Sequence, residues 1–282
     1  MALWKRIARL KGLAYRIEGS SRGYRLLDED AVGPWEFQDG AAVVYQSETA
    51  STMDEAWRLA EKGAPAGTLV IADRQSAGRG RQGRPWCSPG GGLYLTLVLR
   101  PRLPSSHTAC LALEGACALL DWLEAVHGCR LEFHWPNDLM AQGRKVGGLL
   151  VELAGSAEEP RFYLLGLGVN LHSVGLPDRA SSGLADLIRE PPLRRVLAAD
   201  FRERMLAWTA NPLLRPRDWE RRCTQLGQPV VLQDWQGRKL TGIAQAFDDR
   251  GGLILADPQT GTETPYPPGE IRRIRLAQRA VT

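Results

Sequence analysis

Residues 77–101 read AGRGRQGRPWCSPGGGLYLTLVLRP, a basic, glycine-rich stretch that runs directly into an apolar one. Glycines and arginines alternate in its first part, in the order Gly78, Arg79, Gly80, Arg81, Gly83 and Arg84. Glycine allows backbone conformations closed to other residues, and planar guanidinium groups suit phosphates and carboxylates. Trp86 offers a flat surface for stacking a ring, and Leu93–Leu99 predicts a strand. The stretch therefore predicts a loop that closes over an anionic ligand, because a merely solvated basic loop needs neither the tryptophan nor so many glycines.

The order of residues in this loop resembles the signature of biotin–protein ligases, which reads approximately GRGRxGRxWxSPxGxxL. The matching residues are Gly78-Arg79-Gly80-Arg81, Gly83-Arg84, Trp86, Ser88-Pro89 and Leu93 or Leu95. A motif of this length is far more specific than an isolated GxGxxG. The resemblance implies an α+β fold, with a mixed-sheet, class II synthetase-like catalytic domain followed by a C-terminal SH3-like β-barrel.

A second motif spans residues 131–152, LEFHWPNDLMAQGRKVGGLLVE, and resembles the family pattern KWPND…K(V/L)(A/G)GIL(V)E. A strand that ends near Trp135 would present Asn137 and Asp138 on a turn, and Lys145 would return at the start of the next strand. A lysine that enters an apolar strand requires a phosphate or carboxylate partner. His134 stands where the family usually has lysine, so a neutral imidazole would remove a positive charge there.

Two shorter motifs flank these. Ser51-Thr52-Met53 precede a predicted helix over about 54–62, where Ser51 and Thr52 are typical capping residues. The predicted strand Thr68–Ala72 leads to Gln75, whose amide has the donor and the acceptor that a ureido group requires. A further predicted strand, 161–170, ends in Gly-x-Gly-x-Asn with Asn170 last, which is similar to the family's GxGxN element.

The resemblance implies a two-step reaction in which biotin and ATP, with Mg²⁺, give biotinyl-5′-adenylate, and a lysine of a biotin carboxyl carrier protein then takes the biotin. Acetyl-CoA carboxylase or a related biotin enzyme would supply that carrier. Catalysis is assigned to Lys145, Arg81 and Asp138, and Asp138 is also the candidate ligand of the metal ion. Biotin binding is assigned to Ser51, Thr52, Met53, Gln75, Arg79, Gly80, Arg81 and Lys145. Nucleotide binding is assigned to Arg84, Trp86, Asn137 and Asn170.

The composition indicates an ordinary globular protein. Of 282 residues, 44% are hydrophobic and 24% charged, which excludes disorder and a membrane protein. Acidic residues interrupt the most apolar stretch, 110–126, and no signal-peptide pattern precedes it. The five cysteines lack a CxxC spacing and are odd in number, which argues against a disulfide framework or a zinc site. We therefore expect a cytoplasmic protein without a membrane partner.

The N-terminal stretch carries the basic character of the chain. Residues 1–26 contain seven Lys or Arg and one Glu, a local charge of +6, whereas the whole chain has +4. A predicted helix over 3–10 and a predicted hairpin over 17–26 are similar to the recognition helix and wing of the bifunctional ligase–repressor proteins. The sequence lacks the helices that would support them, and a short isolated helix is marginal in water. We therefore expect no DNA binding by the chain as written.

Four segments follow from these patterns. Residues 1–27 form a partial winged helix-turn-helix remnant, and 28–40, which are acidic and turn-rich, form a linker. Residues 41–222 form the biotin- and ATP-binding catalytic domain. Residues 223–282 contain short apolar runs between turns, which predicts a small antiparallel barrel. The family analogy favours a homodimer, although no residue pattern decides the oligomeric state.

Three alternatives remain at this stage. A lipoate- or octanoate-type protein ligase would share the catalytic fold, but no RRxSGGGxVxH-like stretch occurs. A biotin-responsive DNA-binding regulator is the non-enzyme alternative, which the basic N-terminus motivates. A biotin sensor without ligase activity is disfavoured, because retention of biotin alone requires no phosphate-binding groups.

Overall fold

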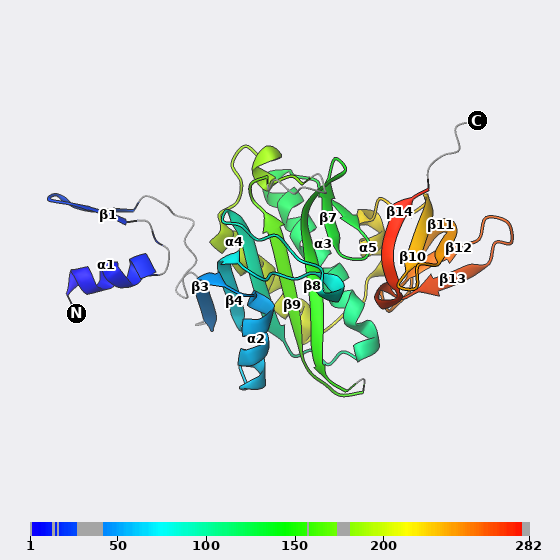
Figure 1. Ribbon diagram of the computed structural model, residues 1–282, viewed down its shortest axis with the longest axis horizontal. Helices are drawn as coiled ribbons and strands as arrows, with labels where there is room; N and C mark the ends of the chain where they lie inside the picture. Colours follow the sequence, from blue (N-terminus) through cyan, green and yellow to red (C-terminus); the bar gives the residue numbers. More distant parts are fainter. Residues whose placement is uncertain are drawn as a thin grey trace.

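The computed structural model describes residues 2–12, 15, 17–26, 42–156, 158–173 and 181–277. The N-terminal helix and hairpin are present as predicted: α1 (Leu3–Gly12), β1 (Ile17–Ser20) and β2 (Gly23–Leu26), at one end of the molecule in Figure 1. Leu3 and Trp4 are 63% and 61% exposed, so α1 leaves apolar side chains uncovered by the described residues. The linker predicted over 28–40 lies outside the described residues.

A seven-stranded mixed sheet forms the centre of the molecule, which confirms the predicted α+β class. The order across it is β3-β4-β5-β9-β8-β7-β6. Only β3 and β4 run parallel among these strands. The strands are β3 (Val43–Thr49), β4 (Leu69–Gln75), β5 (Gly92–Leu99), β6 (Glu132–His134), β7 (Asp138–Ala141), β8 (Arg144–Gly155) and β9 (Pro160–Asn170).

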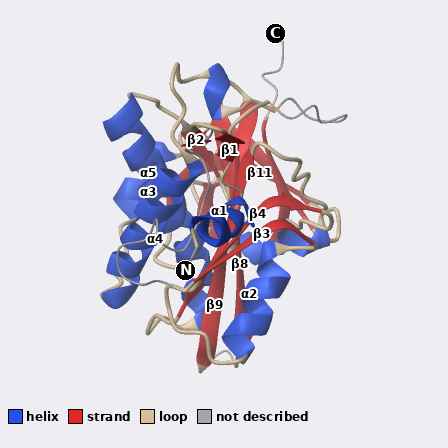
Figure 2. Ribbon diagram, turned by 90° about the vertical axis from the view of Figure 1, so that its left-hand side faces the viewer, coloured by secondary structure: helices blue, strands red, loops and turns tan. Residues whose placement is uncertain are grey.

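Helices cover both faces of this sheet. The helices α3 (Thr108–His127) and α4 (Arg194–Ala210) pack on one face, and α2 (Thr52–Glu61) packs on the other (Figure 2). Successive side chains of a strand point to opposite faces, so Ile71 joins the core under α3 and α4 whereas Val70 joins the core under α2. Strands buried on both faces read as continuous apolar runs, which is why β4 and β5 are visible in the sequence. No helix among the described residues is long and apolar enough to cross a membrane.

The C-terminal part is a five-stranded antiparallel sheet in the order β13-β12-β11-β10-β14 (right-hand side of Figure 1). Its elements are β10 (Pro229–Asp234), β11 (Lys239–Phe247), β12 (Leu253–Ala256), β13 (Glu263–Tyr266) and β14 (Ile271–Leu276), preceded by α5 (Pro216–Arg222). The described strands form an open sheet with β13 and β14 at its two edges, so the predicted SH3-like barrel is not confirmed. Sequence analysis missed α5 and β13; β13 is largely exposed and contains Pro265, so it shows no apolar alternation.

One half-buried carboxylate links the two regions and predicts a pH effect. Glu114 of α3 accepts a hydrogen bond of 2.9 Å from Nε1 of Trp219 in α5, and burial raises its pKa to about 7 from an ordinary 4.5. The folded protein then holds this proton more tightly than the unfolded chain, so the contribution of Glu114 to stability falls as pH rises from about 4.5 to about 7.

We expect Glu114→Gln, whose amide oxygen can still accept from Trp219, to unfold with a free energy that depends less on pH. Relative to the unmodified protein, the variant should gain on the order of 2 kcal/mol between pH 5 and pH 8. Urea unfolding at both pH values measures this. Glu203→Gln, an exposed change on α4, is the control. A constant difference between the unmodified protein and Glu114→Gln at the two pH values contradicts the assignment.

Candidate active site

A cavity of about 990 Å³ lies where the glycine-rich loop crosses the seven-stranded sheet. Its wall is formed by the start of α2, the end of β4, the loop over 76–89, the turn before β7, strands β8 and β9, and β14. The structure brings every predicted site residue to this wall: Ser51, Thr52, Met53, Gln75, Arg79, Gly80, Arg81, Arg84, Trp86, Asn137, Asp138, Lys145 and Asn170.

One end of the cavity is built on the N-terminus of α2. Ser51 caps the helix, because its Oγ accepts from the backbone N–H of Met53 at 3.2 Å. Gln75 Oε1 accepts from the backbone N–H and the hydroxyl of Thr52, at 2.8 and 3.1 Å, and its Nε2 donates to Ser88 Oγ at 2.8 Å. The Gln75 amide therefore joins α2, β4 and the end of the loop into one rigid corner.

Arg79 leaves the loop toward this same end. Its Nε and one terminal nitrogen donate to the two carboxylate oxygens of Glu152, each at 3.0 Å. The other terminal nitrogen donates to Asp54 at 2.5 Å and to Ser51 Oγ at 3.2 Å. The hydrogen bond to Glu152 is the main cause of the raised pKa of Arg79. All these contacts are to protein groups, so in this structure Arg79 acts as a clamp between the loop, α2 and β8.

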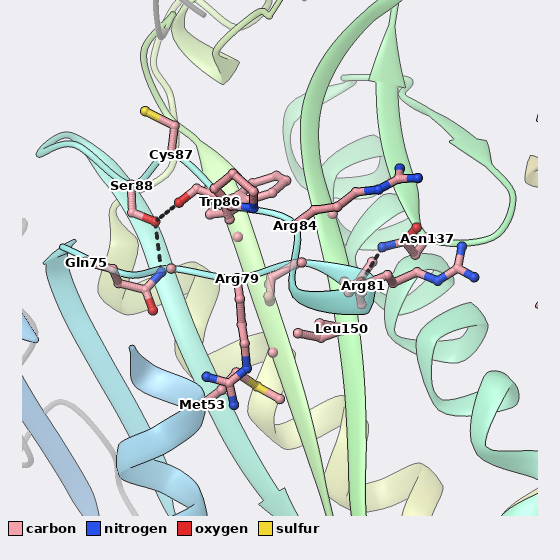
Figure 3. A pocket seen from close by; sticks show the side chains of 18 of the residues that line it. Met53, Gln75, Arg79, Arg81, Arg84, Trp86, Cys87, Ser88, Asn137 and Leu150 are labelled. Atoms are coloured by element: carbon pink, nitrogen blue, oxygen red, sulfur yellow. Dashed lines mark hydrogen bonds between the residues drawn. The ribbon is translucent and has the colours of Figure 1, made fainter. Parts of the chain in front are cut away.

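Arg81 and Arg84 extend in the opposite direction, toward Asn137 (Figure 3). Arg81 donates to the carbonyl oxygens of Pro268 and Ile271, the latter at 3.0 Å, and burial lowers its pKa below the ordinary value of a guanidinium. Arg84 donates to the carbonyl oxygen of Arg272 at 3.3 Å. A guanidinium remains charged at neutral pH under such a shift. The loop therefore spans the cavity, with one end held by α2 and β8 and the other by the C-terminal sheet.

A cation and an aromatic ring meet in the middle. Lys145, at the start of β8, forms an ion pair with Asp138, and its Nζ lies 4.8 Å from the centroid of the Trp86 ring. A Cβ at Gly168 would lie 2.8 Å from that ring, so the glycine of β9 is required for Trp86 to occupy this position. Trp86 Nε1 is buried without a hydrogen-bond partner among the described residues. Asp138 is therefore the carboxylate partner that Lys145 was expected to require.

The two asparagines are fixed by backbone carbonyl groups. Asn137 Nδ2 donates to the carbonyl oxygen of Leu149 at 2.7 Å, and Asn170 Nδ2 lies 3.5 Å from the carbonyl oxygens of Lys145 and Ser182. His134 does not belong to the cavity wall; its Nε2 lies 3.4 Å from Glu132 Oε2.

Sequence analysis missed a second group of residues. Arg74, Trp235, Arg272 and Arg273 also line the cavity, and Glu152 holds Arg79 without lining it. Glu152 carried a signal, because it ends the motif KVGGLLVE. Trp235 and the two arginines carried none, since they come from the C-terminal sheet and reach the loop only through the tertiary fold.

The carboxylates do not form a cage for a metal ion. No group of three or more His, Cys, Asp or Glu side chains with suitable placement occurs among the described residues, and the cavity wall itself holds Glu48 and Asp138. Mg²⁺ usually keeps several waters and binds one or two carboxylates together with substrate phosphates. Glu48 and Asp138 are the carboxylates that the described wall offers to such an ion.

Comparisons with known proteins place this site in a family. A model of the biotin/lipoate A/B protein ligase family matches residues 44–170. The bifunctional ligase/repressor BirA of Bacillus spizizenii is 37% identical in an alignment that covers 94% of this chain and 87% of that protein. The chain belongs to the biotin–protein ligase family. The family expected from the loop is thus confirmed.

Two further relatives of this biotin–protein ligase support the same conclusion. The biotin–[acetyl-CoA-carboxylase] ligase of Paracoccus denitrificans is 34% identical, covering 74% of this chain and 92% of that protein. The solved structure of the biotin protein ligase from Aquifex aeolicus in complex with biotin and ATP superposes with a TM-score of 0.70 at 25% identity, covering 83% of this chain and 99% of that one. The predicted site residues all lie within the span 44–170, whereas Trp235 and β14 lie beyond it.

Proposed function

We propose that this biotin–protein ligase activates biotin with ATP and transfers it to a lysine of a biotin carboxyl carrier protein. In the first step a biotin carboxylate oxygen attacks the α-phosphate, which forms biotinyl-5′-adenylate and releases pyrophosphate. In the second step the lysine amine attacks the acyl carbon, the amide forms, AMP leaves and the amine loses its proton. The observation that carries the proposal is Lys145, whose ammonium lies over Trp86 and beside Asp138 inside a cavity that also holds the Gln75 corner.

The cavity suggests how the two substrates share it. The polar corner of Ser51, Thr52 and Gln75, with Met53 beside it, would hold the biotin head, because hydroxyl and amide groups match a ureido group. Trp86 would stack on adenine, which every base allows through its π face. Lys145 and Arg81 would then lie where carboxylate meets α-phosphate, and the preorganised cations would stabilise charge that shifts in the transition state. Arg84, Asn137 and Asn170 would hold the triphosphate and ribose.

Asp138 has a second role in this proposal. A free lysine has a pKa of about 10.4 and is almost wholly protonated at neutral pH, so the acceptor amine requires a base. Asp138, the first residue of β7, is the carboxylate beside Lys145. Mg²⁺ neutralises charge on the triphosphate when it enters with ATP, and Asp138 would be its protein ligand.

Several finer parts of the proposal rest on family analogy. The relatives named as biotin–[acetyl-CoA-carboxylase] ligases support the biotin carboxyl carrier protein of that enzyme as the acceptor. The same proposal includes the boundaries of the four sequence segments and an SH3-like character of the C-terminal sheet. It also includes a homodimer and a cytoplasmic location. We expect no specific DNA binding, since the described residues leave Leu3 and Trp4 of α1 uncovered.

The clamp on Arg79 leads to a prediction about biotin affinity. We expect Arg79→Ala and Glu152→Ala each to weaken biotin binding about tenfold, which corresponds to roughly 1.4 kcal/mol, because either change releases the loop from β8. Since Glu152 acts through Arg79, the double variant should bind no more weakly than either single one. Calorimetry measures the three dissociation constants. Glu61→Ala, which breaks the exposed pair with Arg161, serves as control. Additive losses in the double variant contradict a shared clamp.

The proposed activation step is tested by isotope exchange. We expect the protein to exchange labelled pyrophosphate into ATP when biotin is present and no acceptor is added. Octanoate and lipoate in place of biotin should support no exchange above the rate without acid. Exchange with lipoate at the rate seen with biotin would replace the proposal with the lipoate-type alternative. A protein that binds biotin tightly without any exchange would be a sensor.

A further inference from the structure

The C-terminal sheet touches the loop through two short segments. One is the turn between β10 and β11, which begins with Trp235, and the other is the segment 268–272 that leads into β14. Trp235 Nε1 donates to the carbonyl oxygen of Gly269 at 2.8 Å, so the indole holds the second segment in place. The Arg84 guanidinium lies 5.7 Å from the centroid of the Trp235 ring. We call Trp235 and residues 268–272 the docking platform.

The docking platform provides hydrogen-bond acceptors for the arginines at one end of the loop. Arg81 donates to the carbonyl oxygens of Pro268 and Ile271, and Arg84 donates to that of Arg272. Carbonyl oxygens and an aromatic face both carry partial negative charge that suits a guanidinium. The backbone N–H of Gly80 in turn donates to the carbonyl oxygen of Arg84 at 2.7 Å. Displacement of Arg84 from the platform would therefore displace the loop backbone.

We infer that Trp235 is a positioning residue, which fixes the platform and through it the nucleotide side of the active site. This inference rests on the proposed function for its kinetic part. Arg84, Trp86 and Trp235 all line the cavity, and Arg84 lies with Arg81 on the side away from Arg79 (Figure 3). The biotin corner has its own anchor in Gln75 and in the Arg79 clamp. Trp235 faces Arg84 directly, so its loss should weaken use of ATP more than use of biotin.

The structure supplies two variants and a matched control. Trp235→Leu removes the ring that faces Arg84 and the donor to Gly269, whereas Trp235→Phe keeps an aromatic face and removes only the donor. Trp235 is half-buried, so Trp235→Phe also provides a milder change if the leucine variant folds poorly. Trp208 has the same chemistry away from the loop: its Nε1 donates to the carbonyl oxygen of Leu213 at 3.0 Å. Trp208→Leu is therefore the control.

The first readout is tryptic cleavage of the full-length, substrate-free protein after Arg81, since Pro85 blocks cleavage after Arg84. We expect cleavage to be about 5- to 20-fold faster in Trp235→Leu, less accelerated in Trp235→Phe and unchanged in Trp208→Leu, because cleavage requires the loop to leave the platform. Equal rates in the unmodified protein and both Trp235 variants would overturn the inference. This readout needs no activity, so it stands even if the proposed ligase function fails.

The second readout is the biotin-dependent exchange of pyrophosphate. In Trp235→Leu we expect the KM for ATP to rise about tenfold, while the KM for biotin changes less than twofold. Trp235→Phe should recover part of the ATP effect. Equal increases in both KM values would overturn the assignment to the nucleotide side, since a general loss of structure affects both substrates. Absence of exchange in the unmodified protein would refute the proposed function. The cleavage rates alone would then test whether Trp235 holds the loop on the docking platform.

Discussion

Lys145→Ala is expected to lower the rate of adenylate formation by roughly 10²–10³-fold, the usual cost of removing one preorganised charge donor from a site where charge develops. The side chain is 15% exposed, forms an ion pair with Asp138 and lies over the Trp86 ring. Its loss should leave the fold intact, because the Asp138 side chain is 33% exposed and can be solvated by water. Biotin-dependent pyrophosphate exchange measures the effect.

Arg144→Ala is the matched control for this change, since Arg144 is the adjacent cation on β8 and is exposed outside the cavity. It should keep the exchange rate within about twofold of the unmodified protein. A folded Lys145→Ala protein with a normal exchange rate would contradict the placement of the carboxylate and α-phosphate beside Lys145. Equal losses of exchange rate in both variants would show that the summed positive charge of this part of β8 matters, and not the position of Lys145.

Asp138→Ala is expected to slow transfer from preformed biotinyl-5′-adenylate to the carrier by about 10²-fold or more, which is the range for loss of a positioned base. Transfer is measured in a single turnover with purified adenylate, so that any effect on activation is bypassed. The slowed rate should rise steeply with pH, because an acceptor lysine with a pKa of about 10.4 loses its proton unaided at higher pH. Recovery toward the unmodified rate at high pH is the signature of a missing base.

Glu132→Gln provides the comparison for Asp138. It removes a carboxylate of similar exposure from the neighbouring strand β6, outside the cavity wall, and should leave transfer unchanged. If Asp138→Ala transfers biotin at the normal rate, another group deprotonates the acceptor lysine. A slow variant whose rate keeps the pH dependence of the unmodified protein would assign Asp138 to orientation of the acceptor and not to proton removal.

The sequence predicts most of the central sheet because its strands are buried on both faces. Runs such as Leu69–Ala72 and Leu93–Leu99 are long, apolar and bounded by turns, so β4 and β5 are visible without tertiary information. Gln75 and Asn170 end their strands and Lys145 lies near the start of β8. All three side chains therefore line one cavity. In contrast, β13 depends on pairing with β12 and has no apolar pattern of its own.

The directions of the arginine side chains could not be predicted from the loop. The motif suggests that Arg79 and Arg81 face a ligand, but in the structure Arg79 meets Glu152 and Arg81 meets carbonyl groups 187 and 190 residues along the chain. A partly buried cation requires acceptors whether or not a substrate is bound. Those acceptors come from β8 and from the C-terminal sheet, and only the tertiary fold brings them to the loop.

The most direct test is the incorporation of labelled biotin into an apo biotin carboxyl carrier domain with ATP and Mg²⁺, with labelled lipoate assayed in parallel. The proposed function predicts ATP-dependent labelling of one carrier lysine by biotin and none by lipoate. Biotin binding without any labelling of the carrier, or equal labelling by lipoate, would contradict it.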